Sequence, residues 1–212
     1  MKVIFEDEHI IVCIKPIGIV SQFSENENNM ISLLKEYCSC NIYPLHRLDR
    51  EVGGIMVFAK NKKSAAILSR DISEQRLKKC YLALIHGIPE QKSGELRDYL
   101  FKDSKKNKSY VVSRARKGVK EAVLEYEVLS TKQFAGNDYS VVKILLHTGR
   151  THQIRVQFSH RKHPLVADRK YGANDNFKEI GLWSYKLQFN HPISNEWLEF
   201  SANPENIIKY FI

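Results

Sequence analysis

Short β-rich segments dominate this chain, and they do not alternate regularly with helical segments. Runs of β-branched and aromatic residues bounded by Gly, Pro, Asn and Asp predict strands. The predicted strands cover residues 3–5, 10–14, 54–59, 80–86, 110–113, 121–129, 139–146, 182–189 and 197–200. The predicted helices cover residues 30–38, 62–75 and 151–160, and a last short helix starts at Pro204. Strands that outnumber helices without a βαβ order are typical of an α+β fold rather than a doubly wound parallel sheet.

The length allows either one domain with a substantial core or two small ones. The chain has 212 residues, of which 43% are hydrophobic. No internal repeat, low-complexity tract or linker interrupts it. We therefore predict a single domain over residues 1–212.

The charge balance suggests an anionic partner. Lys and Arg number 33 against 24 Asp and Glu, which gives a net charge of +9. Nucleic acid is the commonest partner of such a surplus, through phosphate contacts and counterion release. On charge alone, a basic surface without a partner explains the surplus equally well. The run KDSKKNK at residues 102–108 predicts a basic surface turn, and taken alone it is better interpreted as a solvated loop.

Cysteine spacing and the N-terminal residues indicate the cellular setting. Cys13, Cys38, Cys40 and Cys80 are irregularly spaced, which predicts neither a zinc site nor a disulfide framework. Cys13 and Cys80 lie in strand-like runs and are expected in the core. The opening MKVIFEDEHI carries acids where a signal peptide needs an apolar run, and no stretch has the length of a membrane span. These features predict a soluble cytoplasmic protein with no membrane partner.

The stretch HRLDR at residues 46–50 places a carboxylate between two arginines, directly before a predicted strand. A lone Asp at such a junction is usually a turn-former. Here Arg47 and Arg50 flank Asp49, and nearby cations keep a carboxylate ionised even when it is partly buried. An ionised, desolvated Asp is a competent nucleophile. For Arg50 we expect a structural salt bridge.

A second constellation is HTGRTHQIRVQFSHRKHP at residues 147–164. Its basic side chains are Arg150, His152, Arg155, His160, Arg161 and His163. Arg155 adjoins the apolar side of the predicted helix, where an arginine needs an anionic partner. Asp49 is our candidate for that partner. The histidines lack the carboxylate or third imidazole of a close metal site, so a basic edge that faces phosphates is the better interpretation.

Tyr81 follows the pair Lys78–Lys79 on a predicted strand. Its ring could present a face on which a base stacks. A tyrosine of the core explains the local pattern equally well, so both interpretations remain open.

Together these stretches resemble the RluA-type pseudouridine synthases. HRLDREVGGIMVFAK, KKCYLALIHG and TGRTHQIRVQFSHRKHPLVADRKYG are similar to three signature regions of that family, in order and with compatible spacing. IFEDEHIIVCIKPIGIVSQ resembles the family's opening and LWSYKLQFNHP its closing strand. The resemblance covers nearly the whole chain. It implies a pseudouridine synthase fold, in which helices flank a central, mostly antiparallel mixed β-sheet with an RNA-binding cleft.

The resemblance also implies an activity. The enzyme would detach uracil from ribose at N1, turn the base and rejoin it through C5, in specific uridines of ribosomal or transfer RNA. Such an isomerisation involves no redox change and requires no cofactor and no metal. The expected partner is RNA, and the default oligomeric state is a monomer. Two alternatives are an RNA-binding module that has lost activity and a metal-dependent nuclease built on the histidines of residues 152–163.

By the same resemblance, Asp49 is the catalytic carboxylate, and Arg155 holds it charged and aimed. Tyr81 packs against the uracil and assists proton removal from C5. Arg47 fills the space that the flipped base vacates and recovers part of the unstacking cost. The route remains open: attack on the ribose, attack on the pyrimidine ring, or proton removal at the sugar. The candidate RNA-binding residues are His46, Arg47, Arg150, His152 and Gln153.

Two positions depart from the family's pattern. Val52-Gly53-Gly54 stands where Thr-Ser-Gly is common, and Ala167-Asp168 where Gly-Asp is common. Neither change touches Asp49 or Arg155, so we expect them to affect substrate detail rather than chemistry. We also expect a stand-alone catalytic domain without an S4-like RNA-binding domain, whose RNA affinity comes from its own basic surface.

Overall fold

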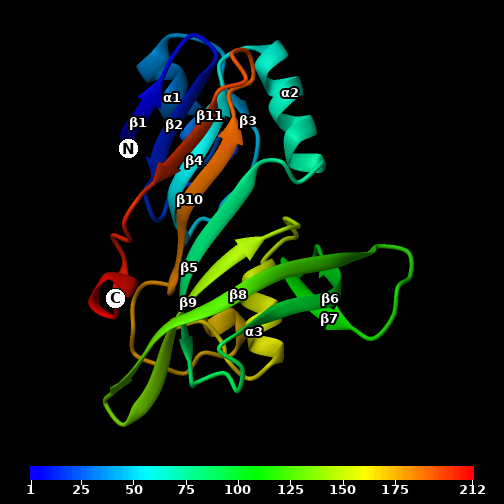
Figure 1. Cartoon of the computed structure of the whole chain (residues 1–212), viewed down its shortest axis with the longest axis vertical. Helices are drawn as coiled ribbons and strands as arrows, with labels where there is room; N and C mark the ends of the chain where they lie inside the picture. The colour runs from blue at the N-terminus through cyan, green and yellow to red at the C-terminus, as the bar shows by residue number, and fades with distance from the viewer. The chain divides into compact units, whose positions relative to one another are not determined.

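The computed structural model describes all 212 residues and divides into two compact units (Figure 1). Unit 1 comprises residues 1–79 and 184–203, and unit 2 comprises residues 80–183 and 204–212. Two strands run along the chain from one unit into the other, β5 (Lys78–His86) and β10 (Leu182–Asn190). That both units together form one catalytic domain stays a prediction.

Unit 1 is a sheet with two helices. Its elements are β1 (Lys2–Glu6), β2 (Ile10–Lys15), α1 (Met30–Cys38), β3 (Tyr43–Pro44), β4 (Gly53–Ala59), α2 (Lys62–Ser73) and β11 (Trp197–Ser201), together with the larger part of β10. The strand order is β1-β2-β4-β10, with β3 also paired to β4 and β11 to β10. Every residue of β2 and β4 is buried, so these two strands form the core of the unit.

Unit 2 contains the remaining strands, one α-helix and two 3-10 helices. Its elements are β6 (Ser93–Asp103), β7 (Lys108–Val112), β8 (Val119–Phe134), β9 (Asn137–Leu146), α3 (Gln153–His160), η1 (Arg169–Tyr171) and η2 (Ile207–Tyr210), together with most of β5. The strand order is β5-β9-β8-β6-β7. Pairings β6–β7, β6–β8 and β8–β9 are antiparallel, as are β1–β2, β2–β4 and β10–β11 in unit 1. The expectation of an α+β fold with mostly antiparallel pairing is confirmed.

One long strand, β6, was not predicted from the sequence. Strand β6 has the sequence SGELRDYLFKD, in which only Leu96 and Leu100 are buried. Charged residues occupy most of its other positions, and such residues are depleted in strands. It forms because β7 and β8 pair with it on both sides. Tertiary pairing therefore overrides a weak local preference.

The helices lie where the sequence predicts them, but several ends differ. Helix α2 ends at Ser73 rather than at residue 75, and the last short helix, η2, begins at Ile207 rather than at Pro204. The first helix, α1, spans the predicted residues, and the Asn29 side chain caps it by accepting a hydrogen bond from the Ser32 amide at 2.8 Å. Helix α3 begins at Gln153 rather than at Thr151, because His152 has a left-handed backbone with φ of 53°. No helix has both the length and the apolar character needed to cross a membrane.

Candidate active site

Asp49 lies in the loop between β3 and β4, four residues before the strand begins, as the sequence predicts. The loop is fixed through its backbone. The Ser21 hydroxyl donates to the Leu48 carbonyl at 2.7 Å and accepts the Leu48 amide at 3.0 Å. The Val52 amide donates to the Asp49 carbonyl at 3.1 Å. Asp49 itself is half-buried.

A glycine is required at the start of the following strand. Gly54 has φ of 120°, and a Cβ there would lie 2.3 Å from the Ser184 carbonyl oxygen. The Ser184 hydroxyl also donates to the Ile55 carbonyl at 2.9 Å. Of the pair Gly53–Gly54, the second is therefore demanded by close backbone approach, and it is the one that the family pattern shares.

The two arginines beside Asp49 have separate surface partners. Arg47 is exposed, and its Nη1 donates to the Gln22 side chain at 3.4 Å. Arg50 forms an exposed ion pair with Glu27. The structural salt bridge expected for Arg50 is confirmed. Arg47 is thus left at the surface, where an RNA could reach it.

The structure reveals a cation that the sequence reasoning did not assign. Lys15, at the end of β2, is fully buried at 0% exposure. Its ammonium donates to the carbonyls of Pro16 at 2.8 Å, Ile19 at 2.7 Å and Arg50 at 3.2 Å. Burial lowers the pKa of Lys15 to about 8, and the negative charge of Asp49 opposes that shift. The signal was a lysine directly after the apolar run IIVCI, which a simple strand end does not require.

His46 is neutral in this setting. Its Nε2 accepts the Val57 amide at 3.2 Å, which assigns the proton to Nδ1. Burial, and then the charge of Lys79, lowers the pKa of His46 to about 3. The Nδ1 atom is buried without a hydrogen-bond partner. RNA contact by His46 stays a prediction.

In unit 2, Arg155 is held by a partner that we did not predict. Its Nε donates to Asp168 Oδ2 at 2.7 Å and its Nη2 to Asp168 Oδ1 at 2.8 Å. The side chains of Arg155 and Asp168 are 4% and 0% exposed. The Arg155 guanidinium also lies 5.2 Å from the centre of the Tyr171 ring. An anionic partner was expected because the arginine is buried, and Asp168 supplies one; the pairing of Arg155 with Asp49 stays a prediction.

The neighbours of Arg155 in the TGRTHQ stretch mostly bind protein groups. Gln153 is 3% exposed; its Oε1 accepts from Thr148 Oγ1 at 2.8 Å and from the Arg150 amide at 3.0 Å. Arg150 Nε donates to the Glu121 carbonyl at 2.8 Å, and His152 Nδ1 lies 2.9 Å from the Tyr171 hydroxyl. Gln153 therefore has a clear role in fixing the turn before α3. Contact of these three residues with RNA stays a prediction.

Tyr81 lies in β5 and is 5% exposed. Lys79, two residues before it, is also buried, and this burial lowers its pKa. The burial of Tyr81 agrees with a core tyrosine and also with a ring that lines an enclosed site. Its role toward uracil stays a prediction. Cys13 and Cys80 are buried as expected.

The histidines of residues 147–164 do not converge on one point. His163 Nδ1 bonds the His86 carbonyl at 2.9 Å, His147 Nε2 bonds Glu125 at 2.8 Å, and His160 is exposed. No three His, Cys, Asp or Glu residues are grouped so that they could hold a metal ion.

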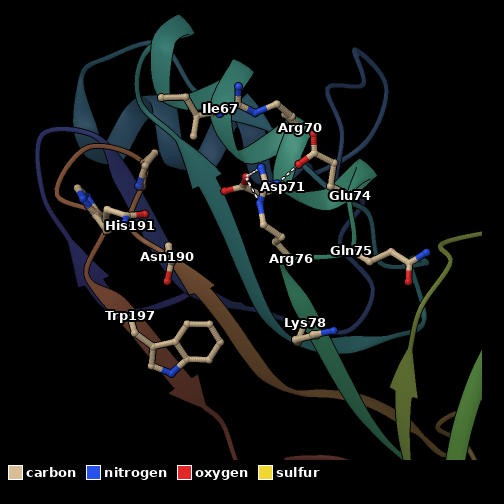
Figure 2. A pocket seen from close by; sticks show the side chains of 12 residues that line it. Ile67, Arg70, Asp71, Glu74, Gln75, Arg76, Lys78, Asn190, His191 and Trp197 are labelled. Carbon is tan, nitrogen blue, oxygen red and sulfur yellow. Dashed lines mark hydrogen bonds and ion pairs between the residues drawn. The ribbon is translucent and has the colours of Figure 1, made fainter.

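Unit 1 contains a cavity of about 870 Å³. It lies between the end of α2, the start of β5 and the β10–β11 hairpin (Figure 2). Its lining includes Arg70, Arg76, Lys78, His191 and Trp197. Side chains of both charges line the cavity, and within it Arg76 Nε donates a hydrogen bond to Asp71 at 3.0 Å. None of the predicted catalytic or RNA-binding residues lines this cavity.

Comparisons with known proteins agree with this fold. The family model described as RNA pseudouridylate synthase matches residues 9–160, more than half of the chain and inclusive of Asp49, Tyr81 and Arg155. An "Uncharacterized RNA pseudouridine synthase" of Aquifex aeolicus is 33% identical over 99% of this chain and 71% of its own length. The "Dual-specificity RNA pseudouridine synthase RluA" of Pasteurella multocida is 32% identical over 96% of this chain and 93% of its own.

The solved structure of human RNA Pseudouridylate Synthase Domain Containing 1 has the same fold, with a TM-score of 0.78 and 24% identity. The structural match covers 96% of this chain and 83% of the human chain. The fold and these matches define a class of RNA-modifying isomerases. The chain belongs to the RNA pseudouridylate synthase family, which confirms the resemblance to RluA-type enzymes drawn from its motifs.

Proposed function

We propose that this pseudouridine synthase uses Asp49 as its catalytic carboxylate. The observation that carries the proposal is the construction of the Asp49 loop. Both of its flanks are tied by hydrogen bonds, through Ser21 on one side and Lys15 on the other. Lys15 also provides a buried positive charge that acts on Asp49. A nearby positive charge stabilises a negatively charged group, and an aspartate carboxylate can act as a nucleophile.

The reaction balances without a further reactant. The bond between uracil N1 and ribose C1′ breaks, and a bond between C5 and C1′ forms. The proton leaves C5, and N1 takes up a proton. Asp49 would act on the sugar or the pyrimidine ring, and Tyr81 would pack against the detached uracil and help remove the C5 proton. Arg155 would keep Asp49 charged and aimed, supported by its fixed orientation against Asp168.

The substrate we propose is a uridine in ribosomal or transfer RNA. The relative from Pasteurella multocida carries the term dual-specificity in its name, which supports a family with more than one kind of target. Arg47, exposed beside Asp49, is the proposed residue that enters the RNA when the base flips out. His46, Arg150, His152 and Gln153 are the further proposed RNA contacts. A cytoplasmic location and a monomeric state complete the proposal.

The test is conversion of uridine in RNA labelled with tritium at C5, because each isomerisation releases that hydrogen to water. We expect wild type to release tritium from total RNA of cells that lack the gene. Asp49→Asn, which keeps the shape and removes the charge, should release none while its melting temperature and RNA affinity stay nearly unchanged.

The neighbouring variant Arg50→Gln is the matched control, since the Arg50 side chain forms a surface ion pair and the exchange keeps the backbone carbonyl that Lys15 binds. Conversion by Asp49→Asn at a rate comparable to wild type would remove Asp49 from the mechanism. RNA binding by wild type with no release from any RNA would favour the non-catalytic RNA-binding alternative.

A further inference from the structure

Most of the net charge of this protein is concentrated in one short segment of unit 2. Residues 102–120, from the end of β6 through β7 to the start of β8, contain eight basic side chains and one acidic side chain. The segment therefore carries +7, whereas the whole chain carries +9. We call it the basic arm. Its basic residues are Lys102, Lys105, Lys106, Lys108, Arg114, Arg116, Lys117 and Lys120.

These cations are available to a partner. All except Lys108 are exposed, and none of the eight forms an ion pair with a carboxylate. The single acid, Asp103, is occupied, since its Oδ1 accepts the amides of Lys105 and Lys106 at 3.0 Å each. Elsewhere in the same sheet, Arg97 is paired with Glu95 and Glu121. The arm thus lacks the neutralising partners that the neighbouring surface has.

Strand pairing brings the two loops of the arm to the same half of β6. Asp103 pairs with Lys108 across the turn of residues 104–107, and Phe101 pairs with Val119 at the end of the loop of residues 113–118. The guanidinium of Arg116 lies 5.7 Å from the centre of the Phe101 ring. In Figure 1 the loop between β7 and β8 lies at the outer edge of unit 2, at the end of the long strand β8. Two basic runs separated in sequence therefore form one surface.

We propose that the basic arm binds the sugar–phosphate backbone of a base-paired RNA stem that flanks the target uridine. Unpaired cations on exposed loops suit phosphates, which contribute affinity without sequence information. Paired RNA is recognised mainly by its shape and backbone. The nearby rings of Phe101 and Tyr110 are approached by Arg116 and Lys108, so cations rather than free aromatic faces are presented. The inference rests on the proposed RNA substrate and assigns the stem-binding surface of the enzyme.

The experiment compares two quadruple variants of the full chain. In the arm variant, Lys105, Lys106, Arg116 and Lys117 are changed to Gln. In the control variant, the exposed residues Lys35, Lys62, Lys63 and Lys178 are changed to Gln, which removes the same charge. The probes are a stem–loop RNA with a uridine-containing loop and an unstructured RNA of equal length, and the measurements are Kd against salt concentration and tritium release.

We expect the arm variant to bind the stem–loop at least tenfold more weakly than the control variant. Its log–log salt dependence should be shallower by about 3, because each lost phosphate contact removes roughly 0.7 to 0.9 from the slope. Its kcat at saturating RNA should stay near wild type while KM rises. Circular dichroism melting should match wild type, since the changed side chains are exposed.

If the arm variant and the control variant have equal Kd values and equal salt dependence, the proposal is overturned. Tritium release by the wild-type enzyme in the same experiment would then show that the proposed isomerase activity holds although the basic arm does not bind the stem. An equal loss of affinity for the stem–loop and the unstructured RNA would overturn the assignment to a paired stem.

Discussion

Asp168 binds the guanidinium of Arg155 through both carboxylate oxygens, at 2.7 and 2.8 Å, with both side chains almost fully buried. Such a two-bond pair orients the plane of an arginine as well as its charge. The Tyr171 ring lies against the same guanidinium, and the Tyr171 hydroxyl accepts the Ser109 amide at 2.8 Å. Arg155 is therefore fixed within unit 2.

Removal of Arg155 should destabilise the protein even where no RNA is bound. Arg155→Ala leaves the Asp168 carboxylate buried without its cation, which typically costs about 3–5 kcal/mol. The double variant Arg155→Ala with Asp168→Asn should recover part of that loss. Arg155→Lys should keep the charge but lose the two-bond geometry and most of the rate. Urea unfolding measures the stabilities, and additive effects at Arg155 and Asp168 would contradict the pair.

A double-mutant cycle like that of Arg155 and Asp168 tests the pairing of Arg155 with Asp49. If the two side chains interact, Asp49→Asn and Arg155→Ala should couple by more than about 0.5 kcal/mol in free energy of unfolding. The double variant should regain some stability but no activity. Additive effects here, beside clear coupling between Arg155 and Asp168, would make Arg150 the better candidate for the partner of Asp49.

Arg47 and Arg50 provide a matched pair of exposed arginines on either side of the catalytic loop. If Arg47 fills the space of the flipped base, Arg47→Ala should lower kcat/KM at least tenfold, which corresponds to about 1.4 kcal/mol. Arg50→Ala should change it less than threefold, because a surface ion pair contributes little. Equal losses would indicate a general charge effect and contradict a specific role for Arg47.

Lys15 should make stability depend on pH in the alkaline range. Its pKa is about 8 in the folded protein and 10.5 in the unfolded chain, so the unfolded state binds more protons between these values. The free energy of unfolding should therefore rise with pH from about 8 to 10.5, by an amount on the order of 3 kcal/mol. Lys15→Met should lack this rise, whereas the exposed control Lys35→Met should keep it. Urea unfolding at several pH values gives the comparison, and identical pH profiles for wild type and Lys15→Met would refute it.

Ala167, which stands where the family commonly has glycine, should have a measurably strained backbone. Ala167 has φ of 58°, a left-handed conformation that glycine adopts without cost and alanine does not. Ala167→Gly should raise the free energy of unfolding by about 0.5–1 kcal/mol. The same exchange inside helix α2, Ala65→Gly, should lower it by a similar amount. Thermal melting of the two variants should thus shift in opposite directions, and a lower melting temperature for Ala167→Gly would show that this turn is not strained.

Local patterns in the sequence determined much of this protein. Alternating and continuous apolar runs define strands wherever their residues are buried, so β2 and β4 were recognisable, and the HRLD motif placed Asp49 in a loop before a strand. The family resemblance rested on such contiguous motifs. Hydrophobic periodicity did not predict β6, because charged residues occupy many of its positions and the strand forms through pairing with its neighbours.

Tertiary structure decided which groups meet. Arg155 finds Asp168 thirteen residues later, and Lys15 reaches the Arg50 carbonyl thirty-five residues away. The sequence predicts that a buried cation needs a partner. It does not predict which residue is that partner, because several acids and carbonyls satisfy the same requirement. The basic arm likewise joins two runs only through the pairing of β6 with β7 and β8. Composition sets the charges that a chain carries, whereas strand register sets the distances over which those charges act.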